Sequence, residues 1–152
     1  MSWAHDGYTV KDSGDFVTLV RAKWGDGTVY GFAITDTQEG SLLGGCSISH
    51  IHGVYRFCNL GYWVRTNVRG RGIAGRAAKL AARWGIERLG LIRIEIVVAT
   101  GNAASIRVAE KLGAQREGIL RNRITAGNRT HDALMFSLIP NDFVLVDNAR
   151  AK

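Results

Sequence analysis

The apolar residues of this chain change their spacing along its length, and each change marks a different kind of element. Near the N-terminus, Phe16, Leu19 and Val20 recur at helical intervals, which predicts a short helix over 15–23. The first dozen residues are polar and contain glycine, so we expect them to be irregular. β-branched and aromatic residues follow and predict three strands, at 28–35, 42–51 and 54–64. Because short connections join these strands, we expect an antiparallel meander.

A helical period returns after the third strand. From Ile73 to Trp84, apolar residues recur at intervals of three and four, which predicts an amphipathic helix over 73–89. Gly85 interrupts this pattern at a cost of roughly 1 kcal/mol relative to alanine. Gly90 stands where a glycine commonly ends a helix.

The last third of the chain combines a strand, a helix and two more strands. The apolar segment LIRIEIVVA at 91–99 is typical of a strand that is buried on both faces of a sheet. A helix is predicted over 103–112, followed by strands at 114–121 and 131–139 that are joined across 125–128. This order predicts a mixed α/β sheet with a strand–helix–strand crossover in its middle.

Length and composition limit the architecture and the compartment. The chain has 152 residues, one proline and no low-complexity linker, which predicts a single domain over 1–152 with a reduced N-terminal part at 1–27 and a C-terminal tail at 141–152. No apolar run approaches the roughly 20 residues of a membrane span, and the N-terminus has no signal pattern, so we expect a cytoplasmic protein with no membrane partner. Cys46 and Cys58 are too few for a disulfide framework, and we interpret both as buried apolar side chains.

Basic residues dominate the charge. The net charge is +7 and the pI is near 9.9, which favours an anionic partner such as nucleic acid, a ribonucleoprotein or a phosphate-bearing cofactor. A solvated basic surface without a specific ligand is the alternative. The segment RTNVRGRGIAGRAAKLAARW at 65–84 concentrates arginine and glycine, so its place in the fold bears on this choice.

The glycines of this segment lie between a predicted strand and a predicted helix. Gly70 and Gly72 allow the backbone to approach a ligand closely, and the helix start beyond them offers unpaired N–H groups and a partial positive charge. Together they predict an anion site that suits a pyrophosphate. Arg69, Arg71 and Arg76 add charge at its rim. A turn with solvated arginines is the alternative interpretation.

Two other glycine motifs fit this segment less well. A P-loop requires lysine followed by serine or threonine after its last glycine, and no such pair follows Gly75. Gly70, Gly72 and Gly75 have the spacing of the dinucleotide fingerprint. That motif belongs to the first strand of a parallel sheet, whereas three antiparallel strands are predicted before it here.

Several segments together resemble the GNAT superfamily of N-acetyltransferases. RGRGIA at 69–74 is similar to the family signature Q/R-x-x-G-x-G/A, which binds the pyrophosphate of acetyl-CoA. GYWV at 61–64 and NAASIRVAEKLGA at 102–114 resemble segments of the subgroup that contains the ribosomal-protein acetyltransferases RimJ and RimL, with Ala114 in place of the usual aromatic residue. The C-terminal pattern of the subgroup is matched by Glu117-Gly118, Gly127-Asn128 and His131-Asp132. The resemblance covers roughly 28–140.

The resemblance implies a fold and a cofactor. The implied α/β (α+β) fold is a mixed, mostly antiparallel sheet with helices on both faces, whose central parallel strands, 60–64 and 91–99, splay around acetyl-CoA. The backbone of Trp63 and Val64 would pair with the pantetheine arm like an added strand, and Asn102 would hydrogen-bond to the same arm. The residues implied to hold the pyrophosphate are Arg69, Gly70, Arg71, Gly72, Ile73, Ala74 and Gly75.

The resemblance also implies a reaction. The primary amine of a peptide N-terminus or of a small molecule would attack the acetyl-CoA thioester directly and release coenzyme A. The enzyme would accept a proton, stabilise the oxyanion and help the thiolate to leave. Many relatives place a tyrosine seven residues after the asparagine, where this chain has Ala109. The subgroup instead suggests Ser105, beside the cofactor, with a local helix-capping role as the alternative.

The general base is not evident from the sequence. Ile124 and Val97 stand where related enzymes carry a glutamate. Glu95 lies on the same strand face as Val97, and Asn59 could position a water that relays the proton. Two further candidates, with a suitable ordinary pKa but an alternative structural role, are His50 and His52.

Two alternatives to an acetyltransferase stay open. A non-catalytic acyl-CoA-binding or regulatory module would explain the missing tyrosine and glutamate. A nucleic-acid-binding protein would use the arginines, but few aromatic residues lie near them and no zinc or RNA-binding signature is present, so we expect neither a nucleic acid nor a metal ligand.

Only about 27 residues precede the first clear strand, fewer than the strand and two helices that usually open the family. The acceptor site would therefore be open, or completed by a second subunit of a homodimer.

Overall fold

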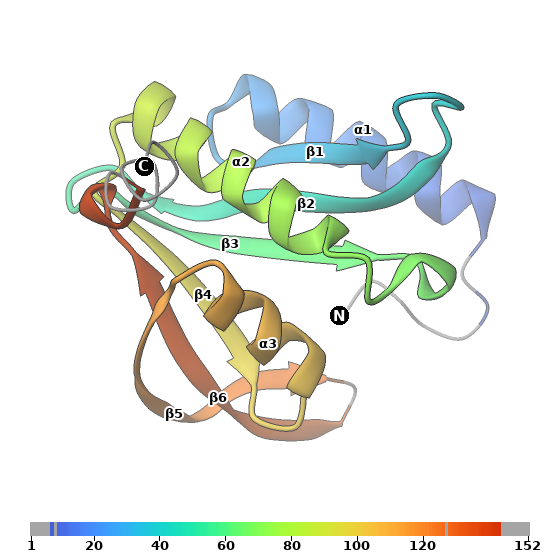
Figure 1. Ribbon diagram of the computed structural model, residues 1–152. Helices are drawn as coiled ribbons and strands as arrows, with labels where there is room; N and C mark the ends of the chain where they lie inside the picture. Colours follow the sequence, from blue (N-terminus) through green and yellow to red (C-terminus); the bar gives the residue numbers. More distant parts are fainter. Residues whose placement is uncertain (1–6, 8, 127, 144–152) are drawn as a thin grey trace, which may run out of the picture.

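A six-stranded mixed sheet with helices on both faces organises the chain, as Figure 1 shows. The computed structural model describes residues 7, 9–126 and 128–143. Its elements are α1 (Val10–Gly25), β1 (Tyr30–Thr35), β2 (Leu42–His52), β3 (Phe57–Val64), a 3-10 turn (Thr66–Val68), α2 (Ile73–Leu89), β4 (Arg93–Ala99), α3 (Ala103–Lys111), β5 (Gln115–Ala126) and β6 (Arg129–Leu138). The strand order is β1-β2-β3-β4-β6-β5, and within the described residues only β3 and β4 pair in parallel. The predicted mixed sheet with a central parallel pair is confirmed.

The sheet separates two helical layers. α2 and α3 cover the face in front in Figure 1, and α1 lies behind the sheet along β1. The side chains of the two central strands that belong to the core shared with α2 are Cys58, Leu60, Ile94, Ile96 and Val98. Because full burial of such an aliphatic side chain contributes about 1.5–3 kcal/mol, this layer supplies much of the hydrophobic stabilisation. No helix in the described ranges is long and apolar enough to cross a membrane.

α1 packs on the sheet face opposite α2 and α3. It approaches β1 closely at one glycine, and aromatic contacts hold its last turn. A Cβ atom at Gly31 of β1 would lie 2.5 Å from Cγ1 of Val20, so only glycine permits this approach of helix and strand. α1 itself contains no fully buried residue. Its last turn carries Trp24, whose ring centroid lies 5.0 Å from that of Tyr30 and 5.9 Å from that of Trp84 on α2. We call this group the aromatic cluster; its members are Trp24, Tyr30, Phe32 and Trp84.

α1 is longer than the helix that the apolar spacing predicts. It begins after Thr9, whose hydroxyl accepts a hydrogen bond from the backbone N–H of Asp12 at 3.3 Å. The Asp12 carboxylate in turn accepts one from the N–H of Thr9 at 2.7 Å. This capping box stabilises the helix start. The expectation of irregular structure is therefore wrong from Val10 onward, while residues 1–6 lie outside the described part of the chain.

Three strands begin two or three residues later than predicted, and the first of them, β1, begins at Tyr30 rather than at residue 28. β3 begins at Phe57 because residues 53–56 form the turn that reverses the chain after β2. β4 begins at Arg93, and Leu91 is buried in the connection before it rather than in the strand.

The β5–β6 hairpin is longer than predicted. β5 reaches Ala126 and β6 begins at Arg129, so the connection is shorter than 125–128, and its residue 127 lies outside the described residues. Register shifts occur between Arg116 and Gly118 and between Leu120 and Ile124 of β5. Such bulges bend a strand, and they let this long hairpin curve away from the rest of the sheet (Figure 1).

Ionic side chains fill the sheet face opposite α2 and α3, near the start of β4. Nε of Arg93 lies 2.9 Å from Oε1 of Glu95, and its Nη1 lies 2.7 Å from Oε1 of Glu117. The hydroxyl of the buried Ser137 donates to the same Glu117 oxygen at 2.6 Å. We call Arg93, Glu95, Glu117 and Ser137 the polar cluster.

The packing of Gly85 generates a prediction about stability. A Cβ at this position of α2 would lie 2.8 Å from Cδ1 of Ile48 and 3.2 Å from Cδ1 of Leu91, so the glycine permits close packing of α2 on the sheet. We expect Gly85→Leu to lower the free energy of unfolding by about 1–3 kcal/mol, because it overpacks a filled core. Gly75 of the same helix faces open space within 4 Å among the described residues, so Gly75→Leu is the matched control. Urea denaturation measures both variants, and equal losses would contradict the interpretation.

The polar cluster generates a prediction about pH. Hydrogen bonds from Arg93 and then Ser137 lower the pKa of Glu117 from 4.5 to about 2. Since the folded-state pKa is depressed, the stabilisation is present above about pH 4.5 and is lost as the pH falls toward 2. We expect Glu117→Gln to lower the free energy of unfolding at pH 7 by on the order of 1 kcal/mol, because the pair is partly exposed and screened.

Denaturant titrations at several pH values would check this expectation, with Glu110→Gln on the exposed surface of α3 as the control. The difference between wild type and Glu117→Gln should close below pH 4.5. A difference that persists near pH 2 would mean that the carboxylate charge does not stabilise the fold.

Candidate active site

β3 and β4 pair only at their first residues and then diverge. Three pairs join them: Phe57–Arg93, Cys58–Ile94 and Asn59–Glu95. Beyond these pairs β3 continues to Val64 and β4 to Ala99, and the two strands separate in Figure 1. The predicted splayed pair is therefore present. Along the facing edges the backbone N–H and C=O groups have no strand partner among the described residues, so they can bind an extended ligand.

A cavity of about 1080 Å³ opens at this divergence. Its walls include residues 60–63 of β3, residues 96–99 of β4, the first residues of α3 and the inner side of α1. A volume of this size accommodates a cofactor arm together with a second ligand. The cavity connects the gap between the strands with the sheet face that α1 covers.

The start of α2 has the geometry of an anion site. Gly70 and Gly72 have φ values of 79° and 73°, in the left-handed region that glycine adopts without strain. Gly72 is the N-cap residue, no side chain caps the helix, and the first turn contains no acidic residue. The N–H of Arg76 bonds back to the carbonyl of Gly72 at 3.1 Å, so the N–H groups of residues 73–75 remain available for an anion.

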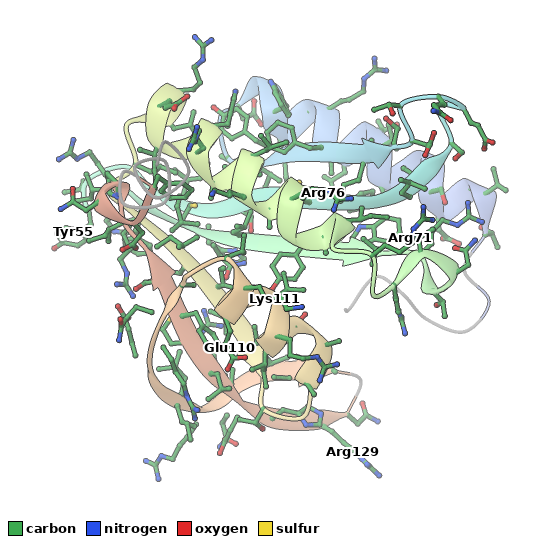
Figure 2. All side chains as sticks on the ribbon, viewed as in Figure 1. Tyr55, Arg71, Arg76, Glu110, Lys111 and Arg129 are labelled. Atoms are coloured by element: carbon green, nitrogen blue, oxygen red, sulfur yellow. The ribbon has the colours of Figure 1, made fainter. Side chains whose placement is uncertain are left out.

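Arginine side chains surround this helix start. Nη1 of Arg76 donates to the carbonyl of Arg71 at 3.2 Å, which places the guanidinium beside Gly72. Figure 2 shows Arg71 and Arg76 at the same end of the molecule, where β3 ends and α2 begins. The structure thus places the predicted residues 69–75 together, as a positively charged loop that runs into the first turn of α2.

The start of α3 borders the cavity from the β4 side. Asn102 is its N-cap residue, and its side-chain oxygen accepts a hydrogen bond from the N–H of Ser105 at 3.1 Å. The carbonyl of Ser105 accepts a 3.0 Å hydrogen bond from the hydroxyl of Tyr62, which reaches across from β3. All three residues line the cavity.

Tyr62 is a site residue that sequence reasoning did not single out. Burial raises its pKa to about 12, against a smaller lowering by its hydrogen bonding with Ser105, so the phenol stays protonated at neutral pH. The alternation of side chains along β3 could have revealed this role. Cys58 and Leu60 are buried, and Tyr62 continues the same face of the strand with a polar hydroxyl at its tip.

Asn59 and Glu95 lie together, but outside the lining of the cavity. They form the last registered pair of β3 and β4, at the narrow end of the gap. Glu95 is also a member of the polar cluster, where it is ion-paired with Arg93. The structure therefore separates these two proposed catalytic residues from Ser105, which lines the cavity.

Apolar residues occupy the positions where the resemblance implies catalytic groups. Ile124 and Val97 both line the cavity. Ala109, on α3, is fully buried in the core.

The remaining histidine and cysteine candidates do not form a reactive centre. Within the described residues His50 and His52 lie outside the cavity lining, and His52 stacks on Tyr55, which Figure 2 places at the opposite end of the sheet from Arg71. Cys46 and Cys58 are free and buried, as predicted. Burial raises the pKa of Cys46 to about 11 and that of Cys58 to about 12, which disfavours a thiolate nucleophile. In the described ranges, no group of three or more metal-ligating side chains is placed to hold an ion.

Comparison with known sequences identifies relatives of this chain. The family described as acetyltransferase (GNAT) domain matches residues 1–115. YdaF of Bacillus subtilis (strain 168), named as a candidate ribosomal N-acetyltransferase, is 31% identical over 105 residues, which are 69% of this chain and 57% of YdaF. The spermidine N(1)-acetyltransferase of Escherichia coli (strain K12) is 26% identical over 109 residues, 72% of this chain and 57% of that protein. The chain thus spans little more than half the length of these two relatives.

Solved structures share the fold. A candidate ribosomal-protein-serine acetyltransferase from Vibrio cholerae has a TM-score of 0.80 at 28% identity, covering 88% of this chain and 76% of that one. The microcin C7 self-immunity acetyltransferase MccE, solved with acetyl-CoA and AMP, has a TM-score of 0.83 at 21% identity, covering 91% and 76%; it is evidence for the fold alone. With its splayed parallel pair, its glycine-rich helix start and the family match over most of its length, this chain belongs to the GNAT acetyltransferase domain family.

Proposed function

We propose that this chain is an acetyl-CoA-dependent N-acetyltransferase that transfers an acetyl group to a primary amine and releases coenzyme A. The observation that carries the proposal is the meeting of three features at one end of the sheet: the edge of β3 that diverges from β4, an uncapped glycine-rich helix start and a large cavity. Each feature suits a different part of acetyl-CoA. We further propose that the protein acts in the cytoplasm, which is supported by two free, buried cysteines.

The cofactor would lie along the divergence of β3 and β4. The backbone of Trp63 and Val64 would hydrogen-bond to the pantetheine arm, as a strand bonds to a sheet edge, and Asn102 would bond to the arm from the other side. The loop at 69–75 would bind the pyrophosphate through the first N–H groups of α2 and the arginine side chains. Ser105 would lie beside the thioester.

The reaction would proceed by direct attack of the amine on the thioester carbonyl. The C–N bond forms, the C–S bond breaks, and the sulfur leaves as a thiolate that needs one proton. We propose Ser105 as the donor, because it lines the cavity at the start of α3, where its backbone carbonyl accepts a hydrogen bond from the protonated Tyr62. Asn59 and Glu95 would act only through ordered water, because Glu95 is ion-paired with Arg93.

The cavity favours a peptide N-terminus over a polyamine as the acceptor. α1 contributes Phe16 and Val17 to the lining, and also Arg21, whose guanidinium is always charged. A positive charge here would repel a polycation and would attract an acidic peptide. Similarity to YdaF supports a ribosomal peptide; similarity to spermidine acetyltransferase supports a polyamine, and Arg21 argues against the latter.

A non-catalytic acyl-CoA-binding module is the second candidate function. It is favoured by the apolar Ile124 and Val97 in the cavity wall and by the buried Ala109. Such a module would bind acetyl-CoA but would release no CoA thiol with any amine or peptide.

Acetyl-CoA binding tests the cofactor part of the proposal. We expect wild type to bind acetyl-CoA in calorimetry and Gly72→Glu to weaken binding about tenfold or more, or about 1.4 kcal/mol. The new carboxylate would face the pyrophosphate, and a φ of 73° disfavours a side chain. Gly53→Glu, at an open position in the turn after β2, is the control of equal charge. Unchanged affinity in Gly72→Glu, or no binding by wild type, would contradict the proposed site.

Substitution of Arg21 tests which class of amine the protein accepts. We expect Arg21→Glu to raise kcat/KM for spermidine relative to an N-terminal peptide by about tenfold, because it replaces repulsion by attraction in the cavity wall. Lys23→Glu makes the same charge change on α1 at a residue outside the lining, and it should leave the ratio unchanged. CoA thiol release measures both substrates. Equal ratios for the two variants would place the acceptor away from α1.

A further inference from the structure

His131 lines the cavity from β6, on the side of the gap opposite β3. Along β6, Leu134 and Phe136 belong to the core shared with α2. Successive strand residues point to opposite faces, so Ala133 and His131 point to the other face, which α1 covers. The imidazole is therefore on the side of the sheet where the residues of α1 form the acceptor wall.

The backbone around His131 is held on both sides. The N–H of Thr100 donates to the carbonyl of Asp132 at 3.1 Å, and the Asp132 carboxylate accepts a hydrogen bond from the N–H of Asn122 at 2.8 Å. His131 pairs with Ile124 of β5, which also lines the cavity. Cross-strand partners have Cβ atoms about 4.5–5.5 Å apart, so these two side chains form adjacent parts of one wall.

The chemistry of the lining distinguishes His131 from its neighbours. Among the described residues, the titratable side chains of the lining are Arg21, Cys46, Tyr62 and His131. A guanidinium, a thiol and a phenol all ordinarily hold their protons at neutral pH, whereas an imidazole, with an ordinary pKa near 6.5, accepts one.

We propose that the imidazole of His131 is the general base that takes a proton from the acceptor amine, directly or through one water. The proposal rests on the acetyl transfer proposed above and assigns its missing proton acceptor. It places the base on a strand held by hydrogen bonds on both edges, which favours a fixed geometry for proton transfer.

The protons balance with this assignment. The acceptor ammonium ion first releases one proton to solvent. As the C–N bond forms, the nitrogen gives its second proton to His131. As the C–S bond breaks, the thiolate takes a proton from Ser105, and the proton on His131 returns through water to Ser105. The net products are the amide, the CoA thiol and one proton, with no oxidant or reductant involved.

Charged groups near His131 must be kept constant in any test by pH. They are Arg123 on β5, Arg129 and Asp132 on β6, and Arg21 in the wall formed by α1. Figure 2 shows Arg129 at the outer end of this hairpin. Residues 96–99 of β4 carry no charge. The variants below therefore leave all of these charged residues in place.

The first test compares His131→Gln with wild type in CoA thiol release, using a panel of N-terminal peptides at saturating acetyl-CoA. We expect kcat/KM to fall about 10²–10⁴-fold, the contribution typical of a general base. Acetyl-CoA affinity in calorimetry should change less than about twofold, and the acid limb of the pH profile due to the base should disappear. His50→Gln, outside the cavity lining, is the matched control and should keep wild-type kinetics.

A second variant separates a chemical role from a structural one. Ile124→Glu in the His131→Gln background places a carboxylate directly across the strand pair from position 131. We expect this double variant to regain at least about tenfold in kcat/KM, because a base returns to the same wall. A loss caused by misfolding would not be restored by a new charge at this half-buried position.

Three results would overturn the assignment. The first is His131→Gln with kcat/KM within about threefold of wild type, since a general base contributes far more. The second is loss of acetyl-CoA affinity in His131→Gln without recovery in the double variant, which would indicate a structural role. The third is wild type that binds acetyl-CoA but releases no thiol with any amine; this result would reject the proposed acetyl transfer itself, whereas the first two leave it standing.

Discussion

The end of hydrogen bonding between β3 and β4 after the Asn59–Glu95 pair is the constraint on which the rest of the site depends. Below this pair the core holds the strands together, since Cys58 and Ile94 are both fully buried. Above it a side chain joins β3 to α3, because the Tyr62 hydroxyl bonds to the carbonyl of Ser105. This bond fixes α3 relative to β3, while no registered pair joins β3 and β4 beyond Asn59 and Glu95 among the described residues.

The two ends of this gap differ in the charges of the groups that line them. The start of α2 presents unpaired N–H groups and arginines, which suit phosphate, near the ends of the strands. The narrow end is occupied by the polar cluster, in which the Glu95 and Glu117 carboxylates both bind Arg93. These carboxylates stabilise the fold and are poorly placed to accept a proton from an amine. The proposed acetyl transfer would therefore rely on residues of the cavity wall between these two ends.

Sequence reasoning placed the glycine-arginine loop correctly between a strand and a helix, but it did not reveal which distant side chains share the cavity, and the reason is distance along the chain. The residues at 69–75 are contiguous, and a strand before them and a periodic helix after them are sufficient to place them. The Tyr62–Ser105 contact joins residues 43 positions apart. The pairing of His131 with Ile124 depends on a bulge in β5 between Leu120 and Ile124, which no periodicity reveals. The start of α1 was missed because its capping box is made of polar residues, whereas the prediction followed apolar spacing.

The aromatic cluster has a mechanical consequence. α2 has 17 residues, so it is a rod about 25 Å long, with the anion site at one end and Trp84 near the other. Trp84 touches Trp24 of α1, and residues of α1 line the cavity. A tilt of α2 on cofactor binding would therefore also move α1 and the part of the cavity wall that α1 forms. Because both ends of that contact are indoles, the intrinsic fluorescence of the protein would report the movement without any added label.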